Sequence, residues 1–250
     1  NQWDNTNEDA FIYSLGLFYK FSDDYRAYFS YSKGYKMPQI RDAFVTNGDL
    51  DAETSNNYEL GLRTQPTDWL EVEMAAYILD FDHKIFREGG LLNNGGKALH
   101  QGIEMSGAIY PVEGLKLYGS GAIQRATIEY GMYKGNRLPY APRYTATAGA
   151  KYQLDCGGGV LTLNGYGNFV SSQFSDQKNT FEGSADGNVG LIPKFFLLNA
   201  TANYSIKQWN VNLNALNLLN RKYFTTRHRA WGGIMPAATI SILAGVGYRF

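Results

Sequence analysis

The connections between the strands predicted for this chain alternate strictly in length. Eleven amphipathic segments follow one another, and every second connection has only three or four residues. The short connections are Phe21 to Asp24, Gln65 to Asp68, Val112 to Gly114, Asp155 to Gly158 and Ile206 to Gln208. The long ones are Lys36 to Asn56, Arg87 to Gly96, Gly131 to Pro142, Ser172 to Pro193 and Thr226 to Met235. Short turns at one end and long loops at the other are typical of outer-membrane β-barrels, whereas a soluble β-sandwich has no reason to sort its loops by length.

Apolar and polar side chains alternate along the predicted strands. From Tyr144 to Tyr152, tyrosine and alanine occupy the even positions, and threonine, glycine and lysine occupy the odd ones. This period suits a strand with lipid on one side and a polar lumen on the other. No stretch approaches the roughly 20 apolar residues of a transmembrane helix. The pattern therefore predicts an all-β chain that forms a transmembrane, antiparallel up-and-down β-barrel.

The composition argues against several other classes of protein. Basic and acidic residues are balanced at 23 each, which gives no reason to expect a nucleic-acid partner. The one cysteine, Cys156, excludes an intrachain disulfide. The three histidines, His83, His100 and His228, are too scattered for a zinc pattern. No cofactor or metal ion is predicted.

Eleven strands of a meander cannot close into a barrel. Because neighbouring strands run in opposite directions, the first and the last would be parallel, whereas single-chain bacterial barrels have even strand numbers. An open edge within lipid leaves backbone groups unpaired, which is very costly. We therefore expect residues 1–250 to be part of one transmembrane barrel domain, half of a barrel of about 22 strands, within a longer polypeptide.

Six segments, in order, resemble motifs of the TonB-dependent outer-membrane receptors. They are 28–38 (YFSYSKGYKMP), 53–61 (ETSNNYELG), 100–104 (HQGIE), 138–142 (LPYAP), 217–224 (NLLNRKYF) and the terminal 247–250 (GYRF). Each motif alone is weak evidence, but six motifs in the right order, spread over almost the whole chain, are strong evidence. The resemblance implies active uptake of a scarce ligand, usually a ferric siderophore or a similar iron chelate, haem, cobalamin or a glycan.

The resemblance also implies a location and partners. The protein would lie in the outer membrane of a Gram-negative bacterium, with its short turns and C-terminus in the periplasm, in contact with lipid and lipopolysaccharide. Energy would come from the inner-membrane TonB complex through an N-terminal plug and a TonB box, neither of which is in this sequence. The barrel assembly machinery would recognise the terminal Phe250.

Basic and aromatic residues of the long loops are candidate ligand contacts, because they suit an anionic, partly aromatic chelate. The candidates are Arg41, Arg87, Tyr133, Lys134, Arg137, Tyr140, Arg227, His228, Arg229 and Trp231. In the last loop, the same basic residues also suit a surface paired with lipopolysaccharide, or pairing with the plug in the lumen.

Two other functions were considered. An outer-membrane phospholipase would need a serine and a histidine within reach on adjacent strands, and no histidine has such a neighbour in the predicted register. A passive porin would need an open, charged constriction, and the six motifs argue against it. We expect a transporter and not an enzyme.

Overall fold

The computed structural model describes residues 10–37, 51–88, 91–228 and 233–250. Eleven strands form one antiparallel sheet, in which each strand pairs with the next one in the sheet order. They are β1 (Ser14–Lys20), β2 (Tyr25–Lys36), β3 (Glu53–Thr67), β4 (Leu70–Glu88), β5 (Leu91–Val112), β6 (Leu115–Ile128), β7 (Tyr144–Cys156), β8 (Gly159–Val170), β11 (Phe195–Ile206), β12 (Trp209–Leu216) and β15 (Ser241–Tyr248). The predicted all-β architecture with eleven strands in one sheet is confirmed. The described residues contain no helix that could cross a membrane.

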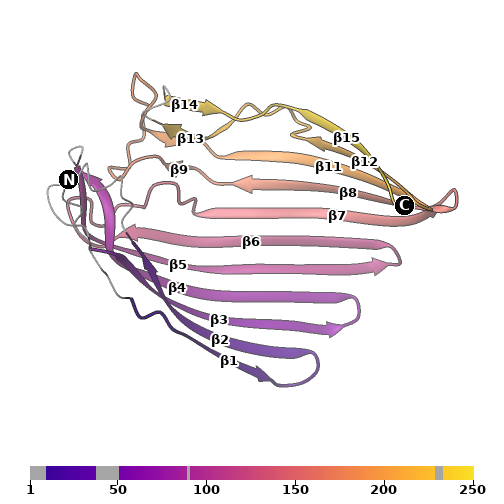
Figure 1. The fold of residues 1–250 in the computed structure, drawn as a ribbon, viewed down its shortest axis with the longest axis horizontal. Helices are drawn as coiled ribbons and strands as arrows, with labels where there is room; N and C mark the ends of the chain where they lie inside the picture. The colour runs from indigo at the N-terminus through magenta and orange to yellow at the C-terminus, as the bar shows by residue number, and fades with distance from the viewer. Residues whose placement is uncertain (1–9, 38–50, 89–90, 229–232) are drawn as a thin grey trace.

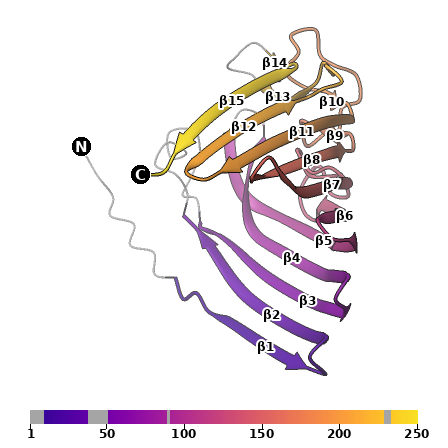
Figure 2. The same cartoon turned by 90° about the vertical axis from the view of Figure 1, so that its right-hand side faces the viewer.

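The sheet curves into an open trough with β1 and β15 at its two edges (Figure 2). Tight turns at 21–24, 68–69, 113–114, 157–158 and 207–208 lie at one end of the trough, where the C-terminus also lies (Figure 1). The longer connections gather at the opposite end. Two small hairpins lie within them: β9 (Gln173–Phe174) with β10 (Leu191–Ile192), and β13 (Phe224–His228) with β14 (Gly233–Pro236).

Several predicted boundaries were wrong. Strand β3, for example, begins at Glu53, within the connection that was predicted to run to Asn56. The connection predicted from Arg87 to Gly96 is strand, because β4 and β5 continue to pair as far as Glu88 and Leu91. A β-bulge after Phe81, with His83 at a φ of 53°, lies within β4 and does not end the pairing. The connection predicted to begin at Thr226 begins at Asn217 instead. Strand β12 ends at Leu216, because Asn217 next along the chain has a φ of 53° and leaves the extended conformation.

Apolar side chains cover the convex face of the sheet. In one register row, Phe29, Leu60, Ala76, Ile103 and Ile123 stand opposite one another from β2 to β6. Leu60, Ile103 and Ile123 are 60 %, 54 % and 62 % exposed. A continuous apolar surface of this extent is not stable in water, but it suits contact with lipid.

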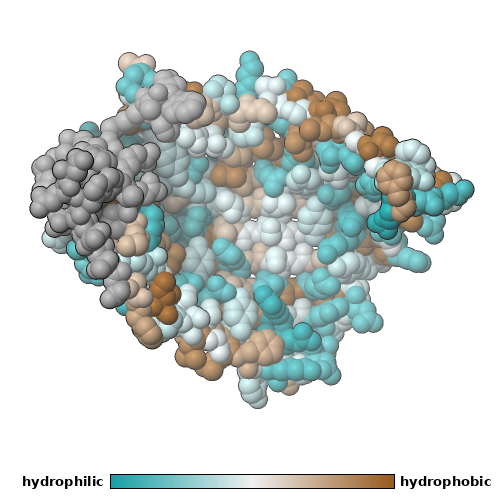
Figure 3. Space-filling model, viewed as in Figure 1, coloured by the Kyte–Doolittle hydropathy of each residue, from teal (hydrophilic) through white to brown (hydrophobic). Residues whose placement is uncertain are grey.

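Polar side chains line the concave face. Arg26, Arg63, Glu73, Ser106 and Ser120 form a register row across β2 to β6. They border a hollow of about 800 Å³. Figure 3 looks into this side and shows mostly hydrophilic and intermediate residues over the middle of the sheet. The period-two pattern has therefore divided the sheet into a lipid face and a lumenal face.

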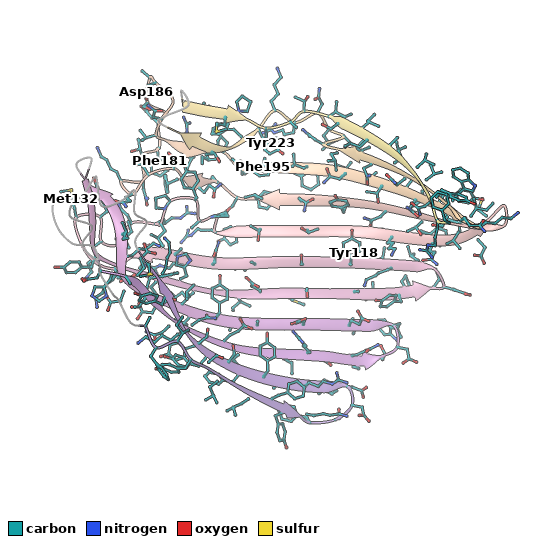
Figure 4. The ribbon with its side chains drawn as sticks, viewed as in Figure 1. Tyr118, Met132, Phe181, Asp186, Phe195 and Tyr223 are labelled. Carbon is teal, nitrogen blue, oxygen red and sulfur yellow. The ribbon has the colours of Figure 1, made fainter. Side chains whose placement is uncertain are left out.

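Three lumenal tyrosines lie flat over glycines of the next strand. The directly opposed pairs are Tyr28 with Gly61, Tyr77 with Gly102, and Tyr118 with Gly149. A Cβ atom at Gly149 would lie 2.6 Å from the ring of Tyr118, so only glycine leaves room for the ring. The Tyr118 side chain extends across Gly149 (Figure 4), and its hydroxyl donates a hydrogen bond of 2.9 Å to Asn164 Oδ1 on β8. Such cross-strand packing fixes the register and compensates for the missing side chain.

The contact between Tyr118 and Gly149 makes a prediction about stability. Gly149→Val should displace the ring, break its bond to Asn164 and lower the free energy of unfolding by about 1–3 kcal/mol. The matched control is Gly165→Val on the neighbouring strand β8, where a Cβ atom would meet nothing within 4 Å. Urea denaturation of the assembled full-length protein measures both variants. Equal losses of stability would show that the ring contact has no special role.

Candidate functional site

The two halves of the sheet differ in charge. In β7, β8, β11, β12 and β15, the charged residues are Lys151 and Asp155 alone, whereas β3 by itself carries Glu53, Glu59 and Arg63. On the charged half, Arg63 Nε lies 2.8 Å from a carboxylate oxygen of Glu73. The lumen therefore has one wall with many charged residues and one wall with few.

Asparagines form much of the wall with few charges. Asn168 Nδ2 donates to Thr147 Oγ1 at 3.0 Å, and its Oδ1 accepts a bond of 3.1 Å from Asn199 Nδ2. Asn199 Oδ1 in turn accepts the backbone N–H of Asn217 at 2.9 Å. This chain of amides holds β7, β8, β11 and the start of the last loop together without any charge.

Three of the longer connections, at the end of the strands opposite the tight turns, are hydrogen-bonded into one unit. We call this unit the loop layer, and it comprises residues 129–143, 171–194 and 217–240, the last without 229–232. Asn179 joins the first two, because its Oδ1 accepts the Arg137 N–H and its Nδ2 donates to the Arg137 carbonyl, each at 2.8 Å. Tyr140 adds a backbone bond to the Phe174 carbonyl at 2.8 Å. Figure 4 shows Phe181, of the second segment, beside β9.

Arg227 joins the second and third segments of the loop layer. Its Nη1 and Nη2 donate to the carbonyls of Gly187 and Leu191 at 2.8 Å and 3.2 Å. The guanidinium also lies over the ring of Phe224, 5.1 Å from the centroid. Tyr140 joins the first segment to the third, because its hydroxyl donates to the Arg227 carbonyl at 2.7 Å. The guanidinium therefore has a structural role that its sequence context did not indicate.

Arg137 is held in a similar way. Its Nη2 donates to the carbonyls of Ala141 and Ser172, and its guanidinium lies 5.4 Å from the centroid of the Phe174 ring. Burial, and then the positive charge of Arg143, lower the pKa of the Arg137 guanidinium. Arg137 therefore has a structural role in the loop layer, with a second cation close by.

The other predicted site residues have different surroundings. Tyr133 is half-buried against a small apolar cluster that includes Ile128 and Leu138. Lys134 is exposed and has no ion pair among the described residues. Arg41, Arg229 and Trp231 lie outside the described residues, and Arg87 and His228 are described only as backbone in β4 and β13. The structure thus brings Arg137, Tyr140 and Arg227 together.

Two further arginines, which the sequence did not single out, lie at the edge of this layer. Arg125 and Arg143 line a pocket of about 230 Å³ together with Arg137. The signal for Arg125 was present, because it follows Ile123 in the lipid-facing register of β6. A charged side chain in a lipid-facing register is destabilising at the middle of the membrane, so its presence there needs an explanation.

Comparison with known proteins identifies the family. A profile described as "TonB dependent receptor-like, beta-barrel" matches residues 1–218. The chain belongs to the TonB-dependent receptor β-barrel family. The resemblance expected from the six motifs is confirmed, and membership of this family places the chain in the outer membrane of a Gram-negative bacterium.

Individual relatives of this TonB-dependent receptor barrel agree. The pesticin receptor of Yersinia pestis is 28 % identical over 254 residues, covering 98 % of this chain and 36 % of the receptor. The ferric citrate transporter FecA, in its unliganded form, has a TM-score of 0.79 at 26 % identity, covering 94 % of this chain and 37 % of FecA. The ferric yersiniabactin uptake receptor FyuA of Yersinia pestis, with a TM-score of 0.69 at 23 % identity, covering 94 % and 35 %, shows the fold alone. The chain thus spans about a third of the length of these relatives.

The contacts of Arg227 predict that the loop layer becomes less stable when this side chain is removed. Arg227→Ala removes two charge-assisted bonds, each worth about 1.5–3 kcal/mol, so amides of residues 181–191 should exchange with deuterium about tenfold faster or more. Lys134→Ala, which removes an exposed loop cation, is the matched control and should leave the exchange unchanged. Hydrogen exchange followed by mass spectrometry checks both. Unaltered exchange in Arg227→Ala would mean that other contacts hold the segment.

Proposed function

We propose that this chain is part of a TonB-dependent receptor that takes up a ferric siderophore or a similar iron chelate. The match of the family profile over residues 1–218 carries the proposal. Relatives named as a pesticin receptor and a ferric citrate transporter support it. A polar lumenal hollow near the tight turns, with a loop layer at the opposite end of the strands, suits such uptake.

The proposal includes parts beyond the chain. Among the described residues, β1 pairs with β2 alone and β15 with β12 alone, so both edges of the sheet offer unpaired backbone groups. In lipid these groups need further strands, and we propose that about 22 strands close the barrel. An N-terminal plug would contact the charged wall of the lumen and link the barrel to the TonB complex. Lipid and lipopolysaccharide would surround the convex face, and the assembly machinery would recognise Phe250. We propose no enzymatic activity.

Energy dependence tests the proposed function. Cells that produce the full-length protein should accumulate iron-55 from a ferric chelate such as ferric citrate, and a proton uncoupler should abolish accumulation but not surface binding. Accumulation that persists with the uncoupler and rises linearly with chelate concentration would indicate a passive porin instead.

The same assay addresses the ligand contacts. We propose that Lys134 and Arg229 contact an anionic chelate, because Arg137 and Arg227 already serve the loop layer. Removing both cations should weaken surface binding by about tenfold or more, and the loss should shrink as salt is raised. Unchanged binding would show that the ligand contacts other residues of the barrel or the plug.

The orientation is a separate proposal: the short turns and the C-terminus face the periplasm. Cys156 is exposed near the tight turn at 157–158 and is a natural probe. A membrane-impermeant maleimide should not modify it on intact cells but should do so after lysis. In a Cys156→Ser background, Lys178→Cys in the loop layer should react on intact cells. The reverse labelling pattern would show that the barrel has the opposite orientation in the membrane.

A further inference from the structure

The convex face carries a groove at the loop end of β4 to β7. It holds about 440 Å³ and is lined by two adjacent register rows: Ile78, Gln101 and Arg125, then Ile103, Ile123 and Tyr144. Tyr77, Gly102 and Gln124 form part of its floor. The isoleucine side chains face the lipid, and Tyr144, 48 % exposed at the start of β7, has the position of an interfacial aromatic residue. The groove thus lies where the hydrocarbon meets the headgroups of the outer leaflet.

The arginine pocket adjoins this groove toward the loops. Arg125 and Arg143 line both the groove and the pocket, and Arg137 lines the pocket alone. No aspartate or glutamate lines either cavity, and the four ion pairs of the described residues do not include these arginines. The nearby carboxylate of Glu129 instead accepts the hydroxyl of Thr127. Three guanidinium groups therefore converge without a compensating negative charge.

The like charges of these guanidinium groups repel each other. Burial, and then the positive charge of Arg143, lower the pKa of Arg137, whereas Arg125 and Arg143 are exposed and can meet an anion. Arg137 already donates to backbone carbonyls, which leaves Arg125 and Arg143 to engage a ligand. Guanidinium groups match phosphate geometry with paired hydrogen bonds.

We propose that the groove and the arginine pocket together bind one phosphorylated lipid of the outer leaflet. An acyl chain lies along Ile103, Ile123 and Tyr144, and a phosphate group contacts Arg125 and Arg143. A soluble anion would satisfy the arginines but would leave the apolar groove on the bilayer side unfilled. The assignment rests on the proposed function only for the membrane location and the orientation of the barrel.

The test uses the full-length receptor, stripped of lipid in detergent and titrated with an acylated, diphosphorylated glucosamine disaccharide. Arg125→Gln with Arg143→Gln should weaken binding by at least about tenfold. The matched control is Lys178→Gln with Lys222→Gln, which removes two exposed cations of the loop layer outside the pocket and should leave the affinity unchanged. Equal affinities of wild type and arginine variant would overturn the proposal.

Two further probes separate a lipid site from a simple anion site. The dephosphorylated lipid should bind wild type as weakly as the intact lipid binds the arginine variant, and the deacylated phosphosugar should bind at least about tenfold more weakly than the intact lipid. A deacylated phosphosugar that binds as tightly as the lipid would overturn the proposal.

Folding and function are monitored separately. Heat-modifiable migration on gels reports assembly of each variant, and Ile123→Ser provides a second variant, which should weaken lipid binding but not binding of inorganic phosphate. Binding of the ferric chelate should be unchanged in the arginine variant. Lipid binding by a receptor that takes up no chelate would refute the proposed function and leave the lipid site standing.

Discussion

The pairing of backbone groups within lipid is the constraint on which the rest of the structure depends. Because hydrocarbon offers no partners for N–H and C=O groups, each strand must be bonded along its length to its neighbours. The simplest connectivity that achieves this is the antiparallel meander, in which every strand of the large sheet between its edge strands β1 and β15 is paired on both sides. Alternating direction then sends every second connection to the same end of the sheet, which is why the tight turns and the longer connections are separated.

Once the backbone is paired, the side chains decide what each face contacts. The convex row through Leu60 and Ile123 is apolar, and the concave row through Arg63 and Glu73 is polar, although the rows belong to the same strands. On the lumenal face, a ring such as that of Tyr118 lies flat over Gly149 and does not stand upright. Large side chains can therefore stabilise the wall and still leave the hollow open.

The sheet could be predicted from the sequence because its signals are local. Period-two alternation and turn residues lie within a few positions of each other, and they gave eleven strands correctly. The loop layer could not be predicted in this way. Arg227 bonds to carbonyls 36 and 40 residues away, and a backbone carbonyl has no sequence signature. The sequence showed cations in loops but not which of them, Arg227 or Lys134, already has partners. The connection predicted from Arg87 to Gly96 was wrong for a different reason, because its glycines and polar residues resemble a loop but lie where the two strands continue to pair.

Charge at the loop end of the strands has two separate structural uses. Near β3, the carboxylate of Glu53 is 7 % exposed, accepts the Ile85 N–H at 2.9 Å and pairs with Lys36 at 3.3 Å, so it ties β2, β3 and β4 together. In the loop layer, guanidinium groups perform the same task for irregular segments, because an arginine offers several donors to unpaired carbonyls. Loops over a polar lumen cannot be held by a large apolar core, so ionised groups with neutral backbone partners fix them. A cation that holds loops in this way has fewer free N–H donors for a ligand, and the number of basic residues in such loops therefore overstates their capacity to bind anions.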